Sequence, residues 1–304
     1  MQTVIDILIL GAGWTSTFLT ELCDERGITY AATSRSGRES TIKFSFDPDS
    51  DDVEPYTVLP KAHTVLITFP IVAKGASERL VRLYTQSHAQ DGSKGGLKTG
   101  FIQLGTSSIW DGARLAAKTD SGPPRPVEHK WYDRHSPYVP TPRAEAEDEL
   151  LALSTTFPAT VLNLSGLWGG TRQPKNWVGR VAPSKEALKN KGSIHMVHGI
   201  DVARAILAIH GDFDKASGQR WLLTDGRVYD WWDLASAWGS PASGPEASKT
   251  TDPEQGPQAT WVRELMTETG VRALPRDVQC LGRALDSRDF WNTFGISPLR
   301  PRLE

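Results

Sequence analysis

Short apolar, β-branched runs alternate with stretches of helical period in the first half of the chain. Residues 3–10 are nearly all apolar, which is typical of a strand covered on both faces of a sheet. In residues 14–26 the apolar positions fall on one helical stripe, and Gly27 stands where a C-terminal cap belongs. This alternation predicts a parallel sheet with crossover helices.

The same pattern predicts further elements along the chain. A helix is expected to begin at Pro142 with Thr141 as its N-cap, and a shorter helical piece is expected near Leu285. Residues 239–258 are dense in Gly, Pro, Ser and charge, which favours a long flexible loop that is either a lid or disordered. Other strands are predicted at 28–34, 41–46, 64–69, 101–104 and 160–164, other helices at 77–90, 201–209, 231–238 and 260–269, and Gly/Pro-rich loops at 92–100 and 120–128.

Composition excludes several classes of protein. The 34 Lys and Arg nearly balance the 36 Asp and Glu, so the chain lacks the basic field that nucleic acid or an anionic membrane requires. Its two cysteines, Cys23 and Cys280, fit neither a disulfide framework nor a thiolate zinc site, and no metal is expected. No secretory signal or run of about 20 apolar residues is visible, so we expect a cytoplasmic protein, monomeric or homodimeric.

A glycine-rich turn links the first predicted strand to the first helix. Gly11 permits a tight turn, and Gly13 permits the close approach of a phosphate to the helix that Trp14 and Thr15 open. Ser16 replaces the third glycine of the usual dinucleotide pattern but is still small. The turn predicts a pyrophosphate site, and the alternative is a tight turn without a ligand.

The end of the second predicted strand bears on which dinucleotide would bind. An acid there would hold a free ribose 2′-hydroxyl, but the sequence has Ser34, Arg35 and Arg38 instead. Because guanidinium groups form paired bonds to phosphate oxygens, we expect NADP(H) in preference to NAD(H). The alternative is two solvated loop arginines. Asp47, after the third strand, would accept from the adenine amino group or cap a turn.

Three later segments, in addition to the glycine turn, resemble the short-chain dehydrogenase/reductase superfamily, in its extended and atypical epimerase/dehydratase branch. They read GTSSIWDG at 105–112, LNLSGLWGG at 162–170 and VHGIDVARA at 197–205. The resemblance implies a seven-stranded, doubly wound Rossmann-type α/β sheet and a smaller, mostly helical C-terminal cap that selects the substrate. We therefore expect residues 1–165 to form the NADP-binding domain and 166–304 to complete the sheet and form the cap.

The resemblance also implies roles for single residues. Thr106 falls at the family's catalytic Ser/Thr position, and Ser107 or Ser108 would take that role if the register shifts. The alternative for these three residues is a hydroxyl-rich turn that satisfies its own backbone. Positions next to the cofactor are implied for Phe69 and Pro70, beside the adenosine ribose, and for Leu164 and Ser165, beside the nicotinamide.

The family's Tyr-x-x-x-Lys pair is missing. Aligned on the family, Val139 takes the Tyr position and Arg143 the Lys position, and Tyr138 comes one residue early. Pro140 and Pro142 prevent Tyr138 and Arg143 from lying one turn apart on one helix. Arg143 would still bind ribose hydroxyls, but it cannot lose a proton near neutral pH. Candidates for a substitute acid or base are His129, Tyr132, His135 and Tyr138, whereas His195 and His198 are expected to fix the loop before the helix at 201–209.

Several tryptophans fall where this fold would place a substrate cleft. Trp110 and Trp168 are candidates to line it, which would suit an aromatic or polycyclic substrate, although core packing is the more common use of such residues. Arg172 would meet a substrate carboxylate or the cofactor phosphates, or it is a plain surface charge. 

The leading functional hypothesis is an NADP(H)-dependent oxidoreductase of the epimerase/dehydratase type that acts on a small organic carbonyl or alcohol. The loss of the Tyr-x-x-x-Lys pair motivates a redox-silent isomerase, cyclase or lyase on the same fold. A third hypothesis is a non-catalytic regulator that senses NADP(H).

Overall fold

The computed structural model describes residues 4–38, 40–89, 98–111, 129–239 and 256–304. Its centre is a seven-stranded, wholly parallel sheet, which confirms the predicted doubly wound α/β fold. The strand order is β11-β7-β5-β4-β1-β2-β3. The strands are β1 (Ile5–Leu10), β2 (Tyr30–Ser34), β3 (Ile42–Lys43), β4 (Ala62–Ile67), β5 (Gly100–Thr106), β7 (Ala159–Leu164) and β11 (Arg220–Leu223).

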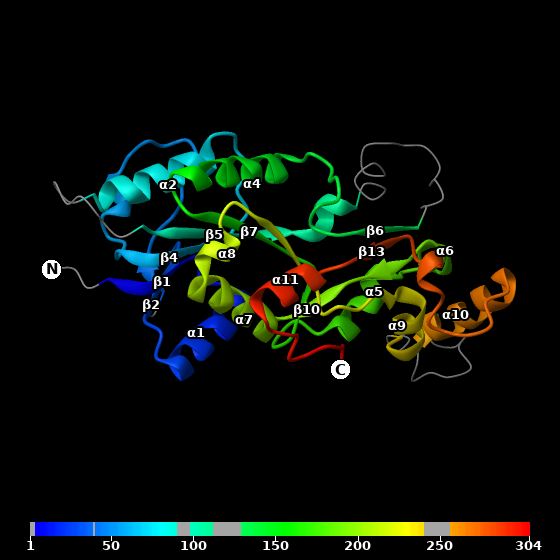
Figure 1. Cartoon of the computed structure of the whole chain (residues 1–304). Helices are drawn as coiled ribbons and strands as arrows, with labels where there is room; N and C mark the ends of the chain where they lie inside the picture. The colour runs from blue at the N-terminus through cyan, green and yellow to red at the C-terminus, as the bar shows by residue number, and fades with distance from the viewer. Residues whose placement is uncertain (1–3, 39, 90–97, 112–128, 240–255) are drawn as a thin grey trace.

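Helices cover both faces of the sheet (Figure 1). One face carries α2 (Ala76–Ser87) and α4 (Pro142–Ala152), and the other carries α1 (Trp14–Arg26), α7 (Gly199–Gly211), α8 (Phe213–Ala216) and α11 (Arg288–Phe294). Between these layers the central strands are almost entirely buried, and Ile7 to Leu10 have no exposed surface. This burial explains why β1 reads as a continuous apolar run.

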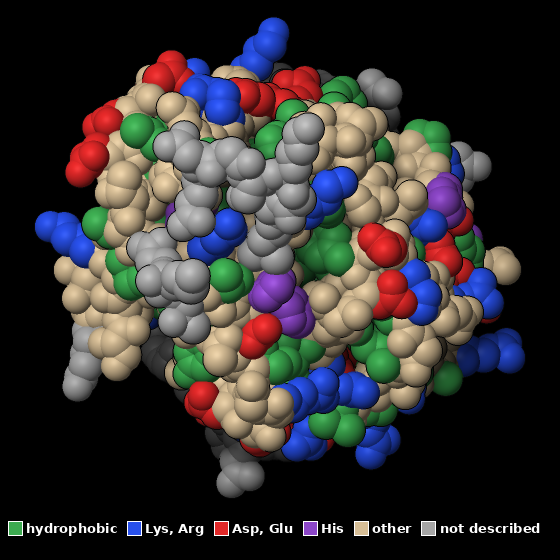
Figure 2. Space-filling model, turned by 60° about the vertical axis from the view of Figure 1, so that its left-hand side comes forward, with side chains coloured by type: hydrophobic (Ala, Val, Ile, Leu, Met, Phe, Trp, Pro, Cys, Tyr) green, Lys and Arg blue, Asp and Glu red, His purple; other side chains and the backbone are tan. Residues whose placement is uncertain are grey.

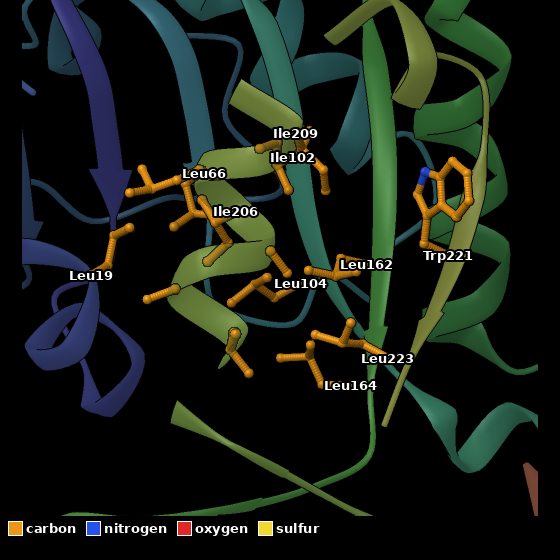
Figure 3. Packing of buried hydrophobic residues seen from close by; sticks show 14 of the residues in the cluster. Leu19, Leu66, Ile102, Leu104, Leu162, Leu164, Ile206, Ile209, Trp221 and Leu223 are labelled. Atoms are coloured by element: carbon orange, nitrogen blue, oxygen red, sulfur yellow. The ribbon is translucent and has the colours of Figure 1, made fainter. Parts of the chain in front are cut away.

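The core beneath α7 shows how the helix is held on the sheet. Ile206 and Ile209 pack against residues of the neighbouring strands, among them Leu66 and Ile102 (Figure 3). Each of these four side chains is fully buried. Burying an aliphatic side chain of this size contributes about 1.5–3 kcal/mol, so this face accounts for much of the fold's stability.

The predicted helix ends at two sites are confirmed. α1 spans Trp14–Arg26, and Gly27 caps it with φ of 65°. α4 begins at Pro142, and the Thr141 hydroxyl accepts a hydrogen bond from Ala144 N at 3.1 Å. Local sequence chemistry therefore fixed these ends.

The cap is built from short elements, all of them beyond β7 in the chain except β6 (Figure 1). Its own small core joins Val178, Leu188, Trp232 and Val262. Three two-stranded sheets, β8 with β10, β9 with β12 and β6 with β13, tie it together. The elements are β6 (Lys130–Tyr132), β8 (Gly166–Trp168), α5 (Val178–Val181), α6 (Lys185–Lys189), β9 (Ser193–Ile194), β10 (Met196–His198), β12 (Tyr229–Asp230), α9 (Trp231–Ala237), α10 (Gly256–Thr269) and β13 (Arg283–Leu285).

Three sequence predictions need correction. The short helix expected near Leu285 begins later, at Arg288, because Arg283–Leu285 form β13. The third strand has two residues, Ile42–Lys43, instead of the predicted six. α10 begins at Gly256, inside the segment predicted as loop, whereas residues 240–255 of that segment lie outside the described residues. Most of the predicted loops at 92–100 and 120–128 lie outside them too.

The surface carries charges of both signs. On the face shown in Figure 2, Lys and Arg side chains are interspersed with Asp and Glu. Among the helices that the structure describes, none is long and apolar enough to cross a membrane.

Candidate active site

The glycine turn lies at the topological switch point of the sheet, where the strand order reverses direction. The chain runs outward from β1 through β2 to β3, then returns to β4 on the other side of β1 and continues through β5, β7 and β11. In open α/β sheets, ligands bind beyond the carboxyl ends of the strands at such a switch point. Gly11 follows β1 directly at this place.

Residues of both neighbouring strands hold the turn. Thr33 of β2 accepts from Gly11 N through its hydroxyl at 3.0 Å and from Ala12 N through its carbonyl at 2.6 Å. Thr68, just after β4, donates its hydroxyl to Gly11 O at 2.7 Å. Gly11 has φ of 96°, and a Cβ there would lie 2.6 Å from Thr68 Oγ1. The protein's own packing therefore requires glycine at position 11.

Gly13 differs from Gly11 because the protein does not require it. Its φ of −116° suits any residue, and the nearest atom to a built Cβ is Gly11 O at 4.0 Å. As the N-cap of α1, Gly13 offers no side chain to the helix's first N–H groups. The exposed Gly13 thus leaves the positive end of α1 open to an anion.

The loop after β2 places its arginines beside this turn. The Arg38 guanidinium donates to Ala12 O, and Arg38 N donates to the Ser34 hydroxyl at 3.1 Å. Arg35 is exposed in the same loop. The structure thus brings Arg38 across the glycine turn, as a residue at the end of the second strand of a dinucleotide fold must be if it is to reach the adenosine ribose.

Phe69 flanks the other side of the turn, and Phe46, which precedes Asp47, packs against it. The Phe69 ring lies stacked on Phe46 with 5.8 Å between centroids, and it would contact a Cβ on Gly11 at 3.3 Å. Pro70 follows on the surface. Asp47 Oδ1 accepts from Asp49 N at 3.0 Å, so Asp47 caps its own turn in this structure, the second of its two expected roles.

The residues after β5 form a short helical turn at the same edge of the sheet. Thr106 Oγ1 accepts from Ser108 N at 3.2 Å and donates to Ser108 Oγ at 3.1 Å. Ser107 is buried. The hydroxyls of Thr106 and Ser108 therefore satisfy the local backbone and each other, and their catalytic role stays a prediction.

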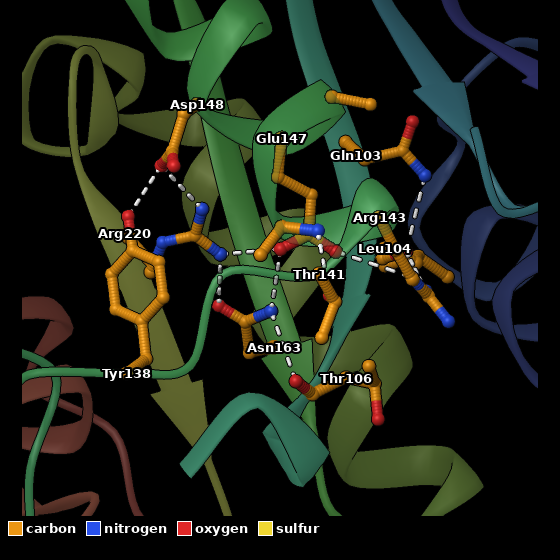
Figure 4. Close-up of polar contacts among 12 residues, drawn as sticks. Gln103, Leu104, Thr106, Tyr138, Thr141, Arg143, Glu147, Asp148, Asn163 and Arg220 are labelled. Atoms are coloured by element: carbon orange, nitrogen blue, oxygen red, sulfur yellow. Dashed lines mark hydrogen bonds and ion pairs between the residues drawn. The ribbon is translucent and has the colours of Figure 1, made fainter. Parts of the chain in front are cut away.

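A buried ion network lies beneath α4. The side chains of Glu147 and Arg220 are 1% and 6% exposed, and Arg220 donates to Glu147 Oε2. Arg220 also donates to Asn163 Oδ1 at 3.0 Å and to Asp148 Oδ1 at 2.9 Å. The network joins β11, β7 and α4, and its charges are paired, as a buried site requires (Figure 4).

Arg143 occupies the end of this network nearest β5. Its Nε donates to Glu147 Oε1 at 3.2 Å and its Nη2 to Leu104 O at 2.6 Å. Figure 4 shows the guanidinium directed away from Arg220 and toward Leu104. Arg143 is thus a fixed cation beside the carboxyl end of β5, where the expected Lys position lies.

Tyr138 lies at the opposite end of the network. Its hydroxyl donates to Asp148 Oδ1 at 2.5 Å, and the Arg220 guanidinium lies over its ring at 4.8 Å. Burial raises the pKa of Tyr138, and its bond to Asp148 raises it further. A phenol with a raised pKa, already donating to a carboxylate, is poorly suited to exchange a proton with substrate.

The other candidate acids and bases lie on β6 or within a few residues of it. His135 is 67% exposed and faces Asp289 of α11 at 3.5 Å, together with Arg134. Tyr132 packs in the cluster of Trp110 and Leu285. His129 lies before β6, with its ring edge-on to Trp131. Among the described residues, none of these three forms a hydrogen bond with Thr106.

The tryptophans expected in the cleft are part of the core. Trp110 is 1% exposed and donates to Ser136 O at 3.0 Å, so its ring is not presented to a ligand in this structure. Trp168 is also buried, edge-on to the ring of His198. Arg172 is exposed, and its guanidinium lies 4.6 Å from the ring of Trp14.

Trp14 connects the glycine turn to the cap. Its Nε1 donates to Gly169 O at 3.1 Å, and its ring packs edge-on against Phe18. The contact with Arg172 places a second cation next to the first turn of α1. The segment after β8 therefore folds back over the start of α1. It lies next to Gly13, where the N-terminus of α1 is open to an anion.

Sequence reasoning missed the charge network. Asn163 interrupts an otherwise apolar buried strand, and a polar residue at such a position was a signal that a partner reaches it from another element. The partners, Glu147 and Arg220, come from 16 and 57 residues away in sequence. His195 was expected only to fix a loop, but it is buried between β9 and β10. Burial lowers the pKa of its imidazole to about 3, and the charge of Arg283 contributes to this shift.

Comparison with known proteins shows the fold alone. No protein-family model matches the sequence, and no curated protein matches it. Among solved structures, a Methylobacillus flagellatus protein assigned to the NAD-dependent epimerases/dehydratases is 14% identical with a TM-score of 0.58, covering 99% of this chain and 95% of that one. UDP-N-acetylglucosamine 4-epimerase from Bacillus cereus is 10% identical with a TM-score of 0.55, covering 97% and 94%.

A third match carries a nucleotide. A short-chain dehydrogenase/reductase superfamily protein from Agrobacterium tumefaciens, with bound NAD, is 12% identical with a TM-score of 0.56, covering 97% of this chain and 92% of that one. At these identities the similarity lies in the arrangement of strands and helices. The chain has the Rossmann-type fold of the epimerase/dehydratase and short-chain dehydrogenase/reductase proteins, over nearly its whole length.

Proposed function

We propose that the chain binds NADP(H) at the glycine turn and is an oxidoreductase of the epimerase/dehydratase kind, acting on a small organic carbonyl or alcohol. The observation that carries this proposal is the contrast between the two glycines of the turn. Gly11 is required by the protein's own packing, whereas Gly13 is required by nothing in the described structure. A phosphate approaching the N-terminus of α1 explains Gly13.

The preference for NADP(H) rests on the loop after β2. Arg38 already lies across the turn through Ala12 O, and the Ser34 hydroxyl and exposed Arg35 lie in the same loop. A 2′-phosphate there would exchange water for charge-assisted bonds to guanidinium groups. The two solved structures named above with NAD in their descriptions are 14% and 12% identical to this chain, so their similarity concerns the fold and not the choice between the two nucleotides.

The residues around the carboxyl ends of β5 and β7 would handle the substrate. A nicotinamide bound there would supply the hydride acceptor or donor. Arg143 is fixed by Glu147 and Leu104 O and would hold ribose hydroxyls as a permanent cation. The Thr106 hydroxyl would exchange its bond to Ser108 for one to the substrate oxygen. The proton would then come from a group other than Tyr138, whose hydroxyl is bound to Asp148.

The test is a calorimetric titration of the purified protein with NADPH and with NADH. We expect Arg35→Ala and Arg38→Ala each to weaken NADPH binding by about tenfold or more, since each removes a bond to a charged group. NADH affinity should change far less in Arg35→Ala. Arg26→Ala is the matched control, because Arg26 is exposed at the opposite end of α1.

Two results would contradict the proposal. Failure to bind either nucleotide would refute the proposal that the chain uses a nicotinamide cofactor. Equal losses of NADH and NADPH affinity in Arg35→Ala would remove the 2′-phosphate contact and leave only the dinucleotide site.

A second candidate function is favoured by the engagement of Tyr138 with Asp148. A redox-silent isomerase, cyclase or lyase would keep the fold without needing that phenol as a proton donor. Turnover that persists after all nucleotide is removed would favour this candidate, whereas absorbance changes of reduced nicotinamide during turnover would favour the oxidoreductase. Tight and state-dependent nucleotide binding without any turnover would instead indicate a regulator that senses NADP(H).

A further inference from the structure

His195 is a buried histidine held in one tautomer. It is 2% exposed and lies between β9 and β10. Its Nε2 accepts a hydrogen bond from Leu285 N at 3.0 Å. An imidazole nitrogen that accepts from a backbone N–H carries no proton, so the proton of the neutral ring is on Nδ1.

The Nδ1–H group of His195 has no hydrogen-bond partner among the described residues. An unpaired buried donor costs about 1–3 kcal/mol, and native structures contain few of them. A bound acceptor oxygen would remove this cost.

Ser165 presents a second buried polar atom without a partner in the described structure. Its hydroxyl makes no hydrogen bond, and the residue is 7% exposed. The two residues belong to adjoining segments, because Gly166 N donates to His195 O at 2.8 Å. Two neighbouring backbone segments thus each carry a buried polar side chain without a hydrogen-bond partner in the described part of the chain.

These residues lie at the edge of the sheet where the substrate is expected. Ser165 follows β7 directly, and Leu164 pairs in register with Thr106 at the end of β5. Leu285 N, which donates to the His195 ring, belongs to β13, and Arg283 of the same strand donates to Ser107 O at 3.0 Å. His195 thus bonds directly to the segment after β7, through Gly166 N. Through β13 it is linked to the segment after β5.

We propose that the Nδ1–H of His195, assisted by the Ser165 hydroxyl, binds a trigonal oxygen of the substrate, that of a carbonyl or a carboxylate. The inference deepens the proposed function and rests on it, since it names the group that replaces the missing phenol as a hydrogen-bond donor. His195 acts as a neutral electrophile and keeps its proton. The proton that a reduction requires therefore comes from solvent or from another group.

The low pKa of His195 supports this role. Burial and the charge of Arg283 keep the ring neutral throughout the physiological range. A donor of this kind polarises a carbonyl without titrating, in contrast to a histidine that acts as a general acid near pH 6.5.

The first experiment observes His195 directly, by long-range ¹H–¹⁵N correlation spectra of protein labelled at histidine. His195→Phe identifies the signal. We expect the Nδ1–H tautomer from pH 8 to pH 5, and a saturable shift of this signal when sodium acetate or acetone is added. The acetate arm detects carboxylate binding and the acetone arm detects carbonyl binding. Exposed His63 in the same spectra is the control for general solvent effects.

Variants then test the pair of residues. Ser165→Ala should weaken binding of the effective probe by about tenfold, the value of one hydrogen bond to a ligand. His195→Asn restores an N–H donor near the Nδ1 position, so it should retain binding that His195→Phe loses. Calorimetric affinity for NADPH should be the same in His195→Phe and His195→Asn as in the unmodified chain, which separates this inference from the cofactor proposal.

The inference is overturned by the Nε2–H tautomer, by equal shifts of His195 and His63, or by no response to either probe. Unchanged probe affinity in Ser165→Ala would remove Ser165 from the site. If NADPH does not bind but His195 still responds to a probe, the cofactor proposal fails and the oxygen subsite stands.

Discussion

Arg143 and Glu147 lie one turn apart on α4, and Arg143 Nε donates to Glu147 Oε1 at 3.2 Å. Glu147 is shared with Arg220, which reaches it from the edge strand β11. One buried carboxylate therefore neutralises two arginines from different elements. The helix that would carry a Tyr-x-x-x-Lys pair carries an Arg-x-x-x-Glu pair instead, and the glutamate sets the position of the arginine.

Replacing the shared carboxylate should destabilise the fold strongly. Glu147→Gln leaves Arg220 buried with only Asp148 as a charged partner, so we expect the free energy of unfolding to fall by about 3–5 kcal/mol. Urea unfolding measures this value. Glu145→Gln, an exposed position on the same helix, should change it by less than about 0.5 kcal/mol. Similar losses in both variants would show that the network contributes nothing specific.

Removing the Tyr138 hydroxyl should affect stability and leave cofactor binding intact. Tyr138→Phe deletes the bond to Asp148, and hydrogen bonds to charged groups contribute about 1.5–3 kcal/mol. Thermal and urea unfolding should show a loss of this size, while the Kd for NADPH stays the same. A large rise in that Kd with unchanged stability would place the phenol at the nucleotide instead.

The two glycines of the turn should respond oppositely to alanine. Gly11→Ala must adopt φ near 96° and meets Thr68 Oγ1, so a loss of about 3 kcal/mol in the free energy of unfolding is expected. Gly13→Ala should lose only about 1 kcal/mol or less, since alanine is a poorer N-cap than glycine. It should bind NADPH at least about tenfold more weakly, because its methyl group occupies the path of the phosphate. Unchanged nucleotide affinity in Gly13→Ala would argue that no phosphate lies there.

Stability should depend on pH through Asp225. Burial raises the pKa of this carboxyl to about 7, although bonds from Tyr229 and Arg227 N oppose the shift. The folded state thus binds a proton that the unfolded state has released above pH 4, and stability from this group is present at low pH and is lost as pH rises toward 7. Asp225→Asn removes this dependence. The change in unfolding free energy between pH 5 and 8 should therefore differ between the two proteins by about 3 kcal/mol.

His195 acts in the opposite sense over the same range. Its folded pKa is about 3, so the unfolded state takes up the proton below pH 6.5 and stability falls with falling pH. The two dependences partly cancel in the unmodified chain, which is why the comparison with Asp225→Asn is needed. Equal pH dependence in the two proteins would contradict the buried-carboxyl interpretation.

Local chemistry in the sequence determined the strand β1, the helix α1 with its Gly27 cap, and the glycine turn between these two elements. It also determined the Thr141-Pro142 start of α4. Each depends on residues within a few positions of one another, so the pattern is legible without the fold. The parallel sheet followed from the alternation of these elements. The resemblance of three segments extended it to seven strands.

Only the tertiary structure decided how the polar residues are used. The strand β13 was not predicted, because its pairing with β6 joins residues more than 150 positions apart and no local pattern encodes that partner. The roles of Tyr138 and Trp110 depended on burial, which comes from packing of distant segments. His195 became a single-tautomer donor through Leu285 N, a contact between residues 90 positions apart in sequence. Short-range propensity sets the elements, whereas desolvation and long-range pairing set the chemistry of the side chains they carry.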